Sequence, residues 1–170
     1  MNRLLQRLFF ILLVLTGTQA NAYQSVMLSP SIGLALGDDK GGKHNSTFFR
    51  ADLDYFPEKE YGIGLFFAQH SEFFFSSSSL SGYGIGATRR WWPNKYFQPY
   101  LRADAFSWSI YDNHTKINSG YSPGLTLGFH LSVKSLFTNT LIKYKFEARR
   151  YLNIDGTDIE QISLGPTFEW

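Results

Sequence analysis

The chain closes with Gln161-Ile162-Ser163-Leu164-Gly165-Pro166-Thr167-Phe168-Glu169-Trp170, in which apolar and polar side chains alternate almost without a break. Successive side chains of a β-strand point to opposite faces, so this alternation predicts a strand with one apolar and one polar face. Similar alternation recurs earlier in the chain, which predicts an all-β fold of about eight strands. The seven earlier segments cover residues 25–37, 49–55, 61–68, 82–91, 100–110, 124–134 and 142–149.

The connections between these segments also alternate in character. Those near 57–59, 93–95 and 136–139 are short, whereas those near 38–45, 74–81, 112–120 and 153–158 are more polar and mostly longer. Short periplasmic turns and longer extracellular loops give this rhythm in bacterial outer-membrane barrels, which have an even number of strands. Both ends of the barrel domain then lie on the periplasmic side.

Residues 1–22 have the features of a cleaved signal peptide. Arg3 and Arg7 form a basic start, residues 8–15 form an apolar core, and Ala20 and Ala22 supply the small side chains of a cleavage site. The alternative is a membrane anchor helix, but the apolar run is shorter than the roughly 20 residues that span a bilayer. We therefore expect residues 23–170 to form a single barrel domain.

Charge and composition exclude several classes of function. Removing Arg3 and Arg7 from the 16 basic residues leaves 14, which equals the 14 acidic residues, so no nucleic-acid partner is expected. The chain has no cysteine, hence neither a disulfide nor a thiolate metal site. The histidines have no close metal-ligand spacing, and we expect no metal and no cofactor.

Alternation alone does not decide whether the apolar face points outward to lipid or inward to a soluble core. Glycine is frequent on the polar face, which suits a narrow lumen, and aromatic residues gather near strand ends, where membrane barrels carry two aromatic girdles. The polar face also holds charges of both signs that could pair inside a closed barrel: Arg50, Asp52, Asp54, Arg90, Arg102, Asp104, Lys143, Lys145, Glu147 and Arg149. These features favour an eight-stranded antiparallel up-and-down transmembrane β-barrel.

One segment breaks the pattern. After Ala105 the alternation slips, with Phe106, Trp108 and Ile110 appearing to take the apolar face. We interpret this slip as a β-bulge.

On this evidence residues 23–170 resemble the small outer-membrane β-barrels of the OmpA-transmembrane, OmpX and OmpW type, which belong to the porin-like barrels. The ending resembles the signal read by the barrel-assembly machinery, carried here by Ile162, Leu164, Phe168 and Trp170, although such signals usually end in Phe. The resemblance implies a cell outer-membrane location, contact with outer-membrane lipid and lipopolysaccharide, and passage through that machinery. It implies no single activity.

Two groups of residues are candidate sites. His130 and Ser132 match the His-x-Ser pair of an outer-membrane lipid A deacylase, but both fall on the inward face near the periplasmic side, away from a lipid substrate. Residues Phe73, Phe74 and Phe75 lie at the outer end of a hairpin, where an exposed apolar patch could contact an extracellular ligand or host surface.

We therefore expect a non-enzymatic barrel with a structural or adhesin-like role through its extracellular loops. The lumen charges are expected to form a plug. The first alternative is a narrow channel for small or amphipathic solutes, and the second is a lipid A acyl hydrolase that uses His130 and Ser132.

Overall fold

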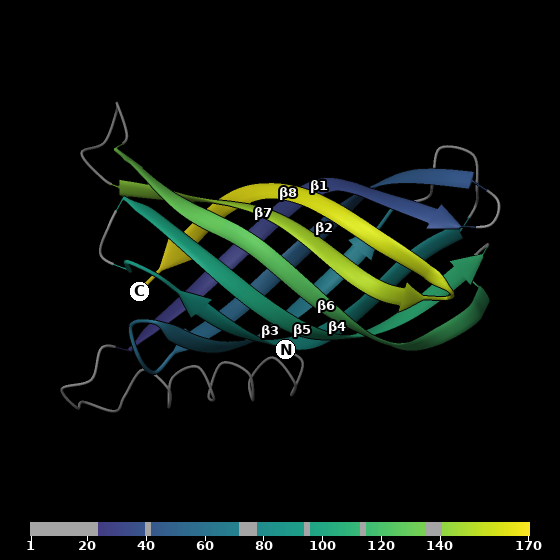
Figure 1. Ribbon diagram of the computed structural model, residues 1–170, viewed down its shortest axis with the longest axis horizontal. Coiled ribbons are helices and arrows are strands. Elements are labelled where there is room, and N and C mark those ends of the chain that lie inside the picture. The colour runs from purple at the N-terminus through teal and green to yellow at the C-terminus, as the bar shows by residue number, and fades with distance from the viewer. Residues whose placement is uncertain (1–23, 40–41, 72–77, 94–95, 113–114, 135–140) are drawn as a thin grey trace, which may run out of the picture.

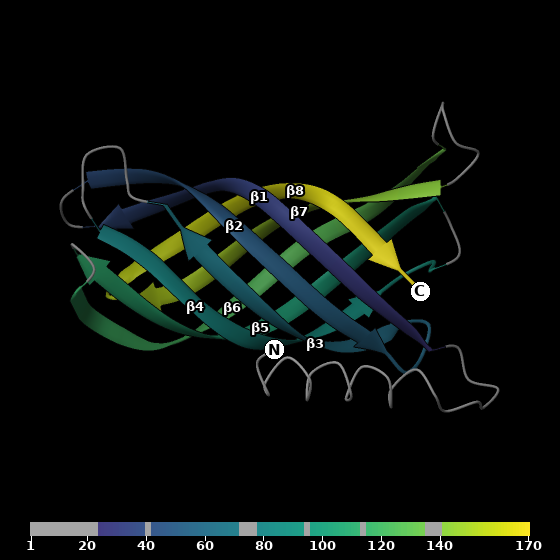
Figure 2. The same ribbon diagram turned by 180° about the vertical axis from the view of Figure 1, so that it is seen from behind.

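The computed structural model describes residues 24–39, 42–71, 78–93, 96–112, 115–134 and 141–170. These residues form one closed antiparallel barrel in which each strand pairs with its neighbours in sequence and β8 pairs with β1 (Figures 1 and 2). The predicted fold class is confirmed, while the expected signal peptide lies outside the described residues. The strands are β1 Ser25–Asp39, β2 Gly42–Phe56, β3 Tyr61–His70, β4 Ser78–Arg90, β5 Phe97–Asp112, β6 Thr115–Lys134, β7 Leu141–Ile154 and β8 Thr157–Glu169.

The first and last strands close the barrel. The backbone N–H of Val26 donates to the carbonyl of Trp170 at 2.9 Å, and the N–H of Trp170 donates back to Val26 at 3.1 Å. Ser25 and Trp170 therefore lie at the same end of the barrel, called the terminal end here (Figure 1). The opposite end, where β1 meets β2, β3 meets β4, β5 meets β6 and β7 meets β8, is called the far end.

The strands are longer at the far end than the sequence predicts. Pairing continues to Asp39↔Gly42, Asp112↔Thr115 and Ile154↔Thr157, so three of the four expected longer connections contain only two residues. Polar side chains do not prevent this pairing, because the ladder is made by backbone groups. Asp155 and Gly156 have φ of 53° and 82°, as in the type I′ turn that joins twisted strands.

The outer face of the barrel is apolar and the inner face is polar over much of the barrel length. Ile32, Leu127 and Ile162 are 65%, 64% and 67% exposed, whereas Arg50 and Arg90 are fully buried inside. A continuous exposed apolar band of this kind requires a nonaqueous surrounding, since water-soluble monomers expose only small apolar patches. The barrel is thus of the transmembrane type. No helix among the described residues is long and apolar enough to cross a membrane.

The β-bulge expected after Ala105 is wrong. The β5–β6 register runs without a shift through Ala105↔Pro123, and the irregularity comes later, between Ile110 and Tyr111. Phe106 and Trp108 are buried on the inner face, in phase with Arg102 and Asp104. From this point the inward side chains are apolar instead of charged. The same alternate positions still point into the lumen.

The inner face therefore has two sections. Toward the far end it is filled by an apolar cluster, and toward the middle it is filled by charged groups. Aromatic rings dominate the cluster, which consists of Ala35, Phe48, Phe66, Ala68, Leu80, Phe106, Trp108, Tyr151, Ile154 and Ile159. The alternation in the sequence predicts small and polar side chains inside the barrel and does not predict this cluster.

Inward-facing glycines make room for the large inward side chains. A Cβ atom added to Gly62 would lie 2.6 Å from the Phe56 ring, and one added to Gly128 would lie 2.5 Å from Tyr100. Gly84 faces the ring of Phe66 and the carbonyl of Ala105 in the same way. The inward glycines thus lie against aromatic rings as well as polar groups, which lets a narrow lumen hold large side chains.

Replacing Gly84 with leucine should destabilise the barrel by about 1–3 kcal/mol, the usual range for overpacking a filled interior. The matched control is Ala87→Leu on the same strand, where the side chain is exposed on the lipid face. Urea titration of the folded form, followed by its mobility on an unheated gel, measures both. Equal stability of the two variants would contradict the packing described above.

Candidate functional site

Eight charged side chains meet in the middle of the lumen. β2 contributes Arg50, Asp52 and Asp54, β5 contributes Arg102 and Asp104, and β7 contributes Lys145, Glu147 and Arg149. Each strand carries them at every second position, so all of them point inward. Four cations and four carboxylates make this set, called the charge layer here, formally neutral.

The ion pairs of the charge layer cross the lumen. Asp52 on β2 accepts from Arg50 at 2.6 Å and from the Lys145 ammonium on β7, also at 2.6 Å. Arg102 on β5 pairs with Asp104 at 2.6 Å and with Asp54 on β2. Since β2, β5 and β7 are not neighbours in the barrel, the pairs Asp52–Lys145 and Arg102–Asp54 join separate walls.

Arg149 and two phenols complete the charge layer. The Arg149 guanidinium donates to Glu147 at 2.9 Å and lies 3.3 Å from Asp104. The Tyr100 hydroxyl donates to Glu147 at 2.7 Å, and Arg50 donates to the Tyr151 hydroxyl at 2.5 Å. Nearly every charged group thus has partners of opposite charge or polar partners, which offsets the cost of removing it from water.

Aromatic rings seal the layer toward the far end. The Phe106 ring on β5 lies 5.6 Å from Phe66 on β3 and 4.8 Å from Tyr151 on β7, measured between centroids. The Arg50 guanidinium lies 3.6 Å from the centroid of Phe66, a cation–π contact that links the two sections of the lumen. Trp108 donates from Nε1 to the Ser122 hydroxyl at 2.9 Å, which satisfies its only polar group.

A second, smaller cluster lies toward the terminal end. Arg90 pairs with Glu169 at 2.9 Å, and Lys143 also pairs with Glu169. The Arg90 guanidinium lies 3.9 Å from the centroid of Phe56 and donates to the carbonyl of Lys59 at 2.6 Å. The ten charged residues expected to form one network therefore divide into two groups. Glu169 was missed as a member, although it occupies an inward position in the alternation of the last strand.

His130 and Ser132 do not form a catalytic pair in the part of the chain that the structure describes. His130 is buried in the lumen and stacks on the Tyr100 ring at 4.9 Å. No hydrogen bond joins it to Ser132 or Glu147 among these residues, and the backbone N–H of Ser132 donates to Tyr96. Its Nδ1 atom is buried with no described partner, so the histidine fills the lumen instead of facing lipid.

A buried histidine that sequence analysis did not single out lies toward the far end. His70 contacts the Ser46 hydroxyl at 3.3 Å and the Gln161 amide at 3.0 Å, and it stacks on Phe48 at 5.3 Å. Alternation along β3 would have placed it inside, opposite the outward Gln69. Described histidines, aspartates and glutamates form no group of three that could hold a metal ion.

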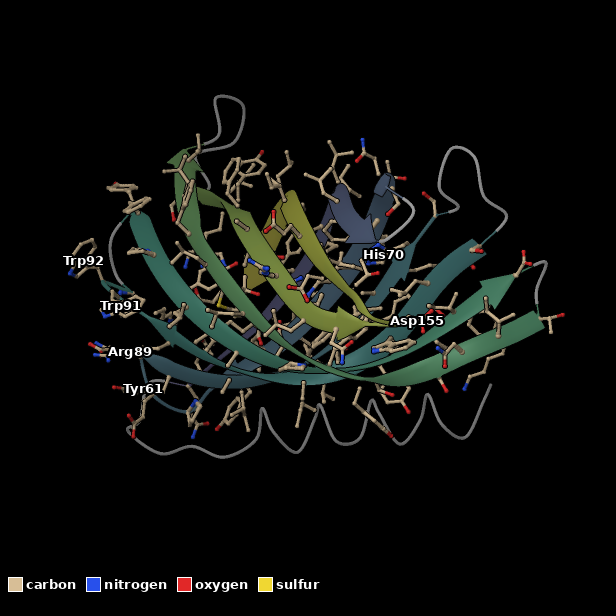
Figure 3. All side chains as sticks on the ribbon, turned by 45° about the vertical axis from the view of Figure 1, so that its right-hand side comes forward. Tyr61, His70, Arg89, Trp91, Trp92 and Asp155 are labelled. Atoms are coloured by element: carbon tan, nitrogen blue, oxygen red, sulfur yellow. The ribbon has the colours of Figure 1, made fainter. Side chains whose placement is uncertain are left out.

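Aromatic side chains gather at the terminal end of the apolar band, where one of the two expected girdles falls. Tyr61, Trp91 and Trp92 gather around Arg89 at the terminal end, far from Asp155 in the β7–β8 turn (Figure 3). The Arg89 guanidinium lies 5.5 Å from the Tyr61 ring and 5.2 Å from the Trp91 ring. Arg89 thus places a charge on the outer face where aromatic side chains mark the membrane boundary.

Of the remaining candidates, Phe73, Phe74 and Phe75 lie outside the described residues. Ile162, Leu164, Phe168 and Trp170 face outward on β8 or just after it. Their role as an insertion signal stays a prediction.

Breaking the charge layer should destabilise the protein strongly. Arg102→Leu removes the cation paired with Asp54 and one of the cations paired with Asp104, and losing one partner of a buried pair costs about 3–5 kcal/mol. The control is Arg150→Leu, which breaks an exposed pair with Asp158 at 2.8 Å and should change stability little, because water screens exposed charges. Urea titration in micelles compares the two, and a double variant, Arg102→Leu with Asp54→Leu, should recover part of the loss. Similar losses in both single variants would contradict the layer's structural role.

No family model matches the sequence, and no curated protein matches it either. Solved structures do match the fold. The crystal structure of Neisserial surface protein A aligns over 84% of this chain and 95% of its own, with a TM-score of 0.62 and 14% identity. OprG from Pseudomonas aeruginosa aligns over 86% and 97%, with a TM-score of 0.55 and 9% identity.

The N-terminal barrel domain of Pseudomonas aeruginosa OprF aligns over 85% of this chain and 97% of its own, with a TM-score of 0.52 and 14% identity. At such identities the likeness concerns the fold alone. Together with the apolar outer band and the closed ladder of eight strands, it confirms the resemblance found in the sequence: this chain has the fold of the small outer-membrane β-barrels.

Proposed function

We propose that the protein is a non-conducting, non-enzymatic barrel of the bacterial outer membrane, with a structural role in the envelope and a far end that faces outward for surface contact. The observation that carries the proposal is the set of ion pairs between Asp52, Lys145 and Arg102 on separate walls. A lumen spanned by direct side-chain contacts offers no open path at that level. Eight-stranded barrels have interiors just wide enough for side chains to fill.

The location and orientation rest on the outer face and the fold. The apolar band needs a lipid surrounding, and the solved structures named above come from outer-membrane proteins. Barrels of that membrane keep their termini in the periplasm, so the terminal end is periplasmic and the far end is extracellular. The exported chain would reach this place after removal of residues 1–22 and with help from the barrel-assembly machinery.

A surface-contact role draws on the far end. Three of its four connections contain two residues, and the longer one, residues 71–77, includes Phe73, Phe74 and Phe75. We propose that an extracellular ligand or host surface contacts this segment. Loops on a rigid barrel are where binding residues usually sit.

The channel alternative requires a continuous open path through the lumen. Wild-type protein in planar bilayers should show no steady conductance. The rings of Phe66, Phe106 and Tyr151 pack together inside the lumen on the far-end side of the charge layer. The controls are a detergent blank and heat-unfolded protein. Reproducible unitary current steps from folded protein alone would overturn the non-conducting proposal.

The enzyme alternative requires lipid A acylation to depend on His130. Mass spectrometry of lipid A should give the same acyl pattern in a deletion strain and in strains carrying wild-type protein, His130→Ala or His70→Ala. His70 is the matched control because it is also buried in the lumen. An acyl-chain difference that depends on His130 and not on His70 would establish a hydrolase.

A further inference from the structure

Strands β4, β5 and β6 run side by side in the barrel wall (Figure 1). A groove of about 370 Å³ is lined mainly by their outward residues. Its floor is made by serines and its sides by tyrosines, with one lysine at its far-end edge. Phe67, Trp108 and Tyr111 also line it. The residues used below are Ser81, Tyr83, Ser107, Ser109, Lys116, Ser119 and Tyr121, and the groove is called the serine groove here.

The strand register explains its shape. Ser107 on β5 pairs with Tyr83 on one side and with Tyr121 on the other, so the two tyrosines stand two strand spacings apart across a short side chain. Neighbouring strands are about 4.8 Å apart, which places the tyrosines on the order of 10 Å from each other. That gap admits one six-membered sugar ring in van der Waals contact, at about 4 Å, with a tyrosine face.

The chemistry of the groove suits a saccharide. Its four serine hydroxyls can each donate and accept, and among the described residues none of them has a side-chain or backbone hydrogen-bond partner. Tyr83 and Tyr121 are 69% and 85% exposed, so their rings are free to stack on the C–H face of a sugar. Lys116 is exposed at the edge, where it can pair with a phosphate or carboxylate on that sugar.

The position of the groove on the barrel wall indicates that its sugar belongs to a membrane lipid. One outward position closer to the terminal end, the same three strands present Ile85, Ala105 and Pro123, which belong to the apolar band. The serine groove therefore begins where lipid contact ends, and it opens sideways toward neighbouring lipids. A ligand there would have its sugar in the groove and its acyl chains beside the apolar band.

The contrast with the other large groove on the wall supports this reading. That groove crosses β6, β7, β8 and β1, has a volume of about 880 Å³ and is lined mainly by apolar side chains such as Leu34, Leu127 and Ile162. Such a lining fits acyl chains of any lipid. The serine groove differs because it offers hydroxyls, aromatic faces and a cation together.

We propose that the serine groove binds the anionic sugar headgroup of an outer-leaflet glycolipid of the protein's own membrane. The assignment rests on the orientation in the proposed function and adds a specific lipid site to it. Tyr83 and Tyr121 hold the sugar ring, the serines bind its hydroxyls, and Lys116 pairs with its anionic substituent.

The test uses the refolded mature barrel in detergent micelles, titrated with three probes. These are rough lipopolysaccharide, phosphatidylglycerol, and the water-soluble core oligosaccharide released from the same lipopolysaccharide. Lipopolysaccharide should bind at least tenfold more tightly than either of the others. Equal binding of phosphatidylglycerol would reduce the groove to a general anionic-lipid contact and overturn the proposal. Equal binding of the free oligosaccharide would overturn the membrane source in favour of a soluble glycan.

Variants locate the effect. Lys116→Gln should weaken lipopolysaccharide binding about fivefold, the effect of one basic group near an anionic surface, and Tyr121→Ala should weaken it about threefold to tenfold. Ser107→Leu should also lower affinity, because it fills the floor while leaving both tyrosines. The controls are Tyr96→Ala at the terminal end and Ala87→Leu on the lipid face, both exposed. Unchanged affinity in all three groove variants, or equal loss in the controls, would overturn the site.

A cysteine label separates this proposal from the orientation on which it rests. The chain has no native cysteine, so Ser119→Cys gives a single thiol in the groove. A membrane-impermeant maleimide should label it in intact cells. Labelling only in broken cells would overturn the orientation and the outer-leaflet assignment together, whereas labelling in intact cells without a sugar preference in micelles would overturn the glycolipid site alone.

Discussion

The structure depends on one constraint: charged side chains inside a lipid-embedded barrel must find their partners within the lumen. The charge layer meets it with four cations and four carboxylates on β2, β5 and β7, joined by contacts such as Lys145–Asp52 at 2.6 Å. Because β2 lies apart from β5 and β7 around the barrel, these pairs also tie together strands that share no ladder. The backbone ladder that closes the barrel and the ion pairs that fill its lumen therefore stabilise the same arrangement of strands.

The same constraint explains the inner glycines. A large aromatic ring inside a narrow lumen needs space on the neighbouring strand, and Gly62 and Gly128 provide it beside Phe56 and Tyr100. Interiors packed at this density tolerate little change in volume. A glycine-rich inner face therefore indicates two things: a narrow lumen, and large side chains beside the glycines on that face.

Much of this arrangement could be predicted from the sequence, because a period of two fixes which side chains share a face. That rule predicted eight strands, put the charged set inside and placed an aromatic girdle at the terminal end. It failed after Ala105, where polarity was mistaken for direction: Phe106 and Trp108 looked like lipid-facing residues and are buried inside. It also failed to extend the strands to the far end, since polar residues such as Asn118 and Ser119, which it placed in a loop, pair in the ladder as readily as apolar ones. Which charges meet could not be predicted, because the contacts depend on strand positions around the barrel.

The failure at Ala105 has a physical cause that bears on function. Along β5, the middle section has charges inside and apolar residues outside, and the section toward the far end has Phe106 and Trp108 inside and Ser107 and Ser109 outside. The first arrangement suits lipid and the second suits water, where burying apolar side chains is favourable. The strand therefore passes from one solvent to another without changing its geometry, and the point of inversion marks the membrane boundary on this wall. In the proposed orientation, a polar groove that starts at such a boundary meets the headgroups of the outer leaflet. A glycolipid bound there would have its sugar against Tyr83 and Tyr121 and its acyl chains beside Ala105.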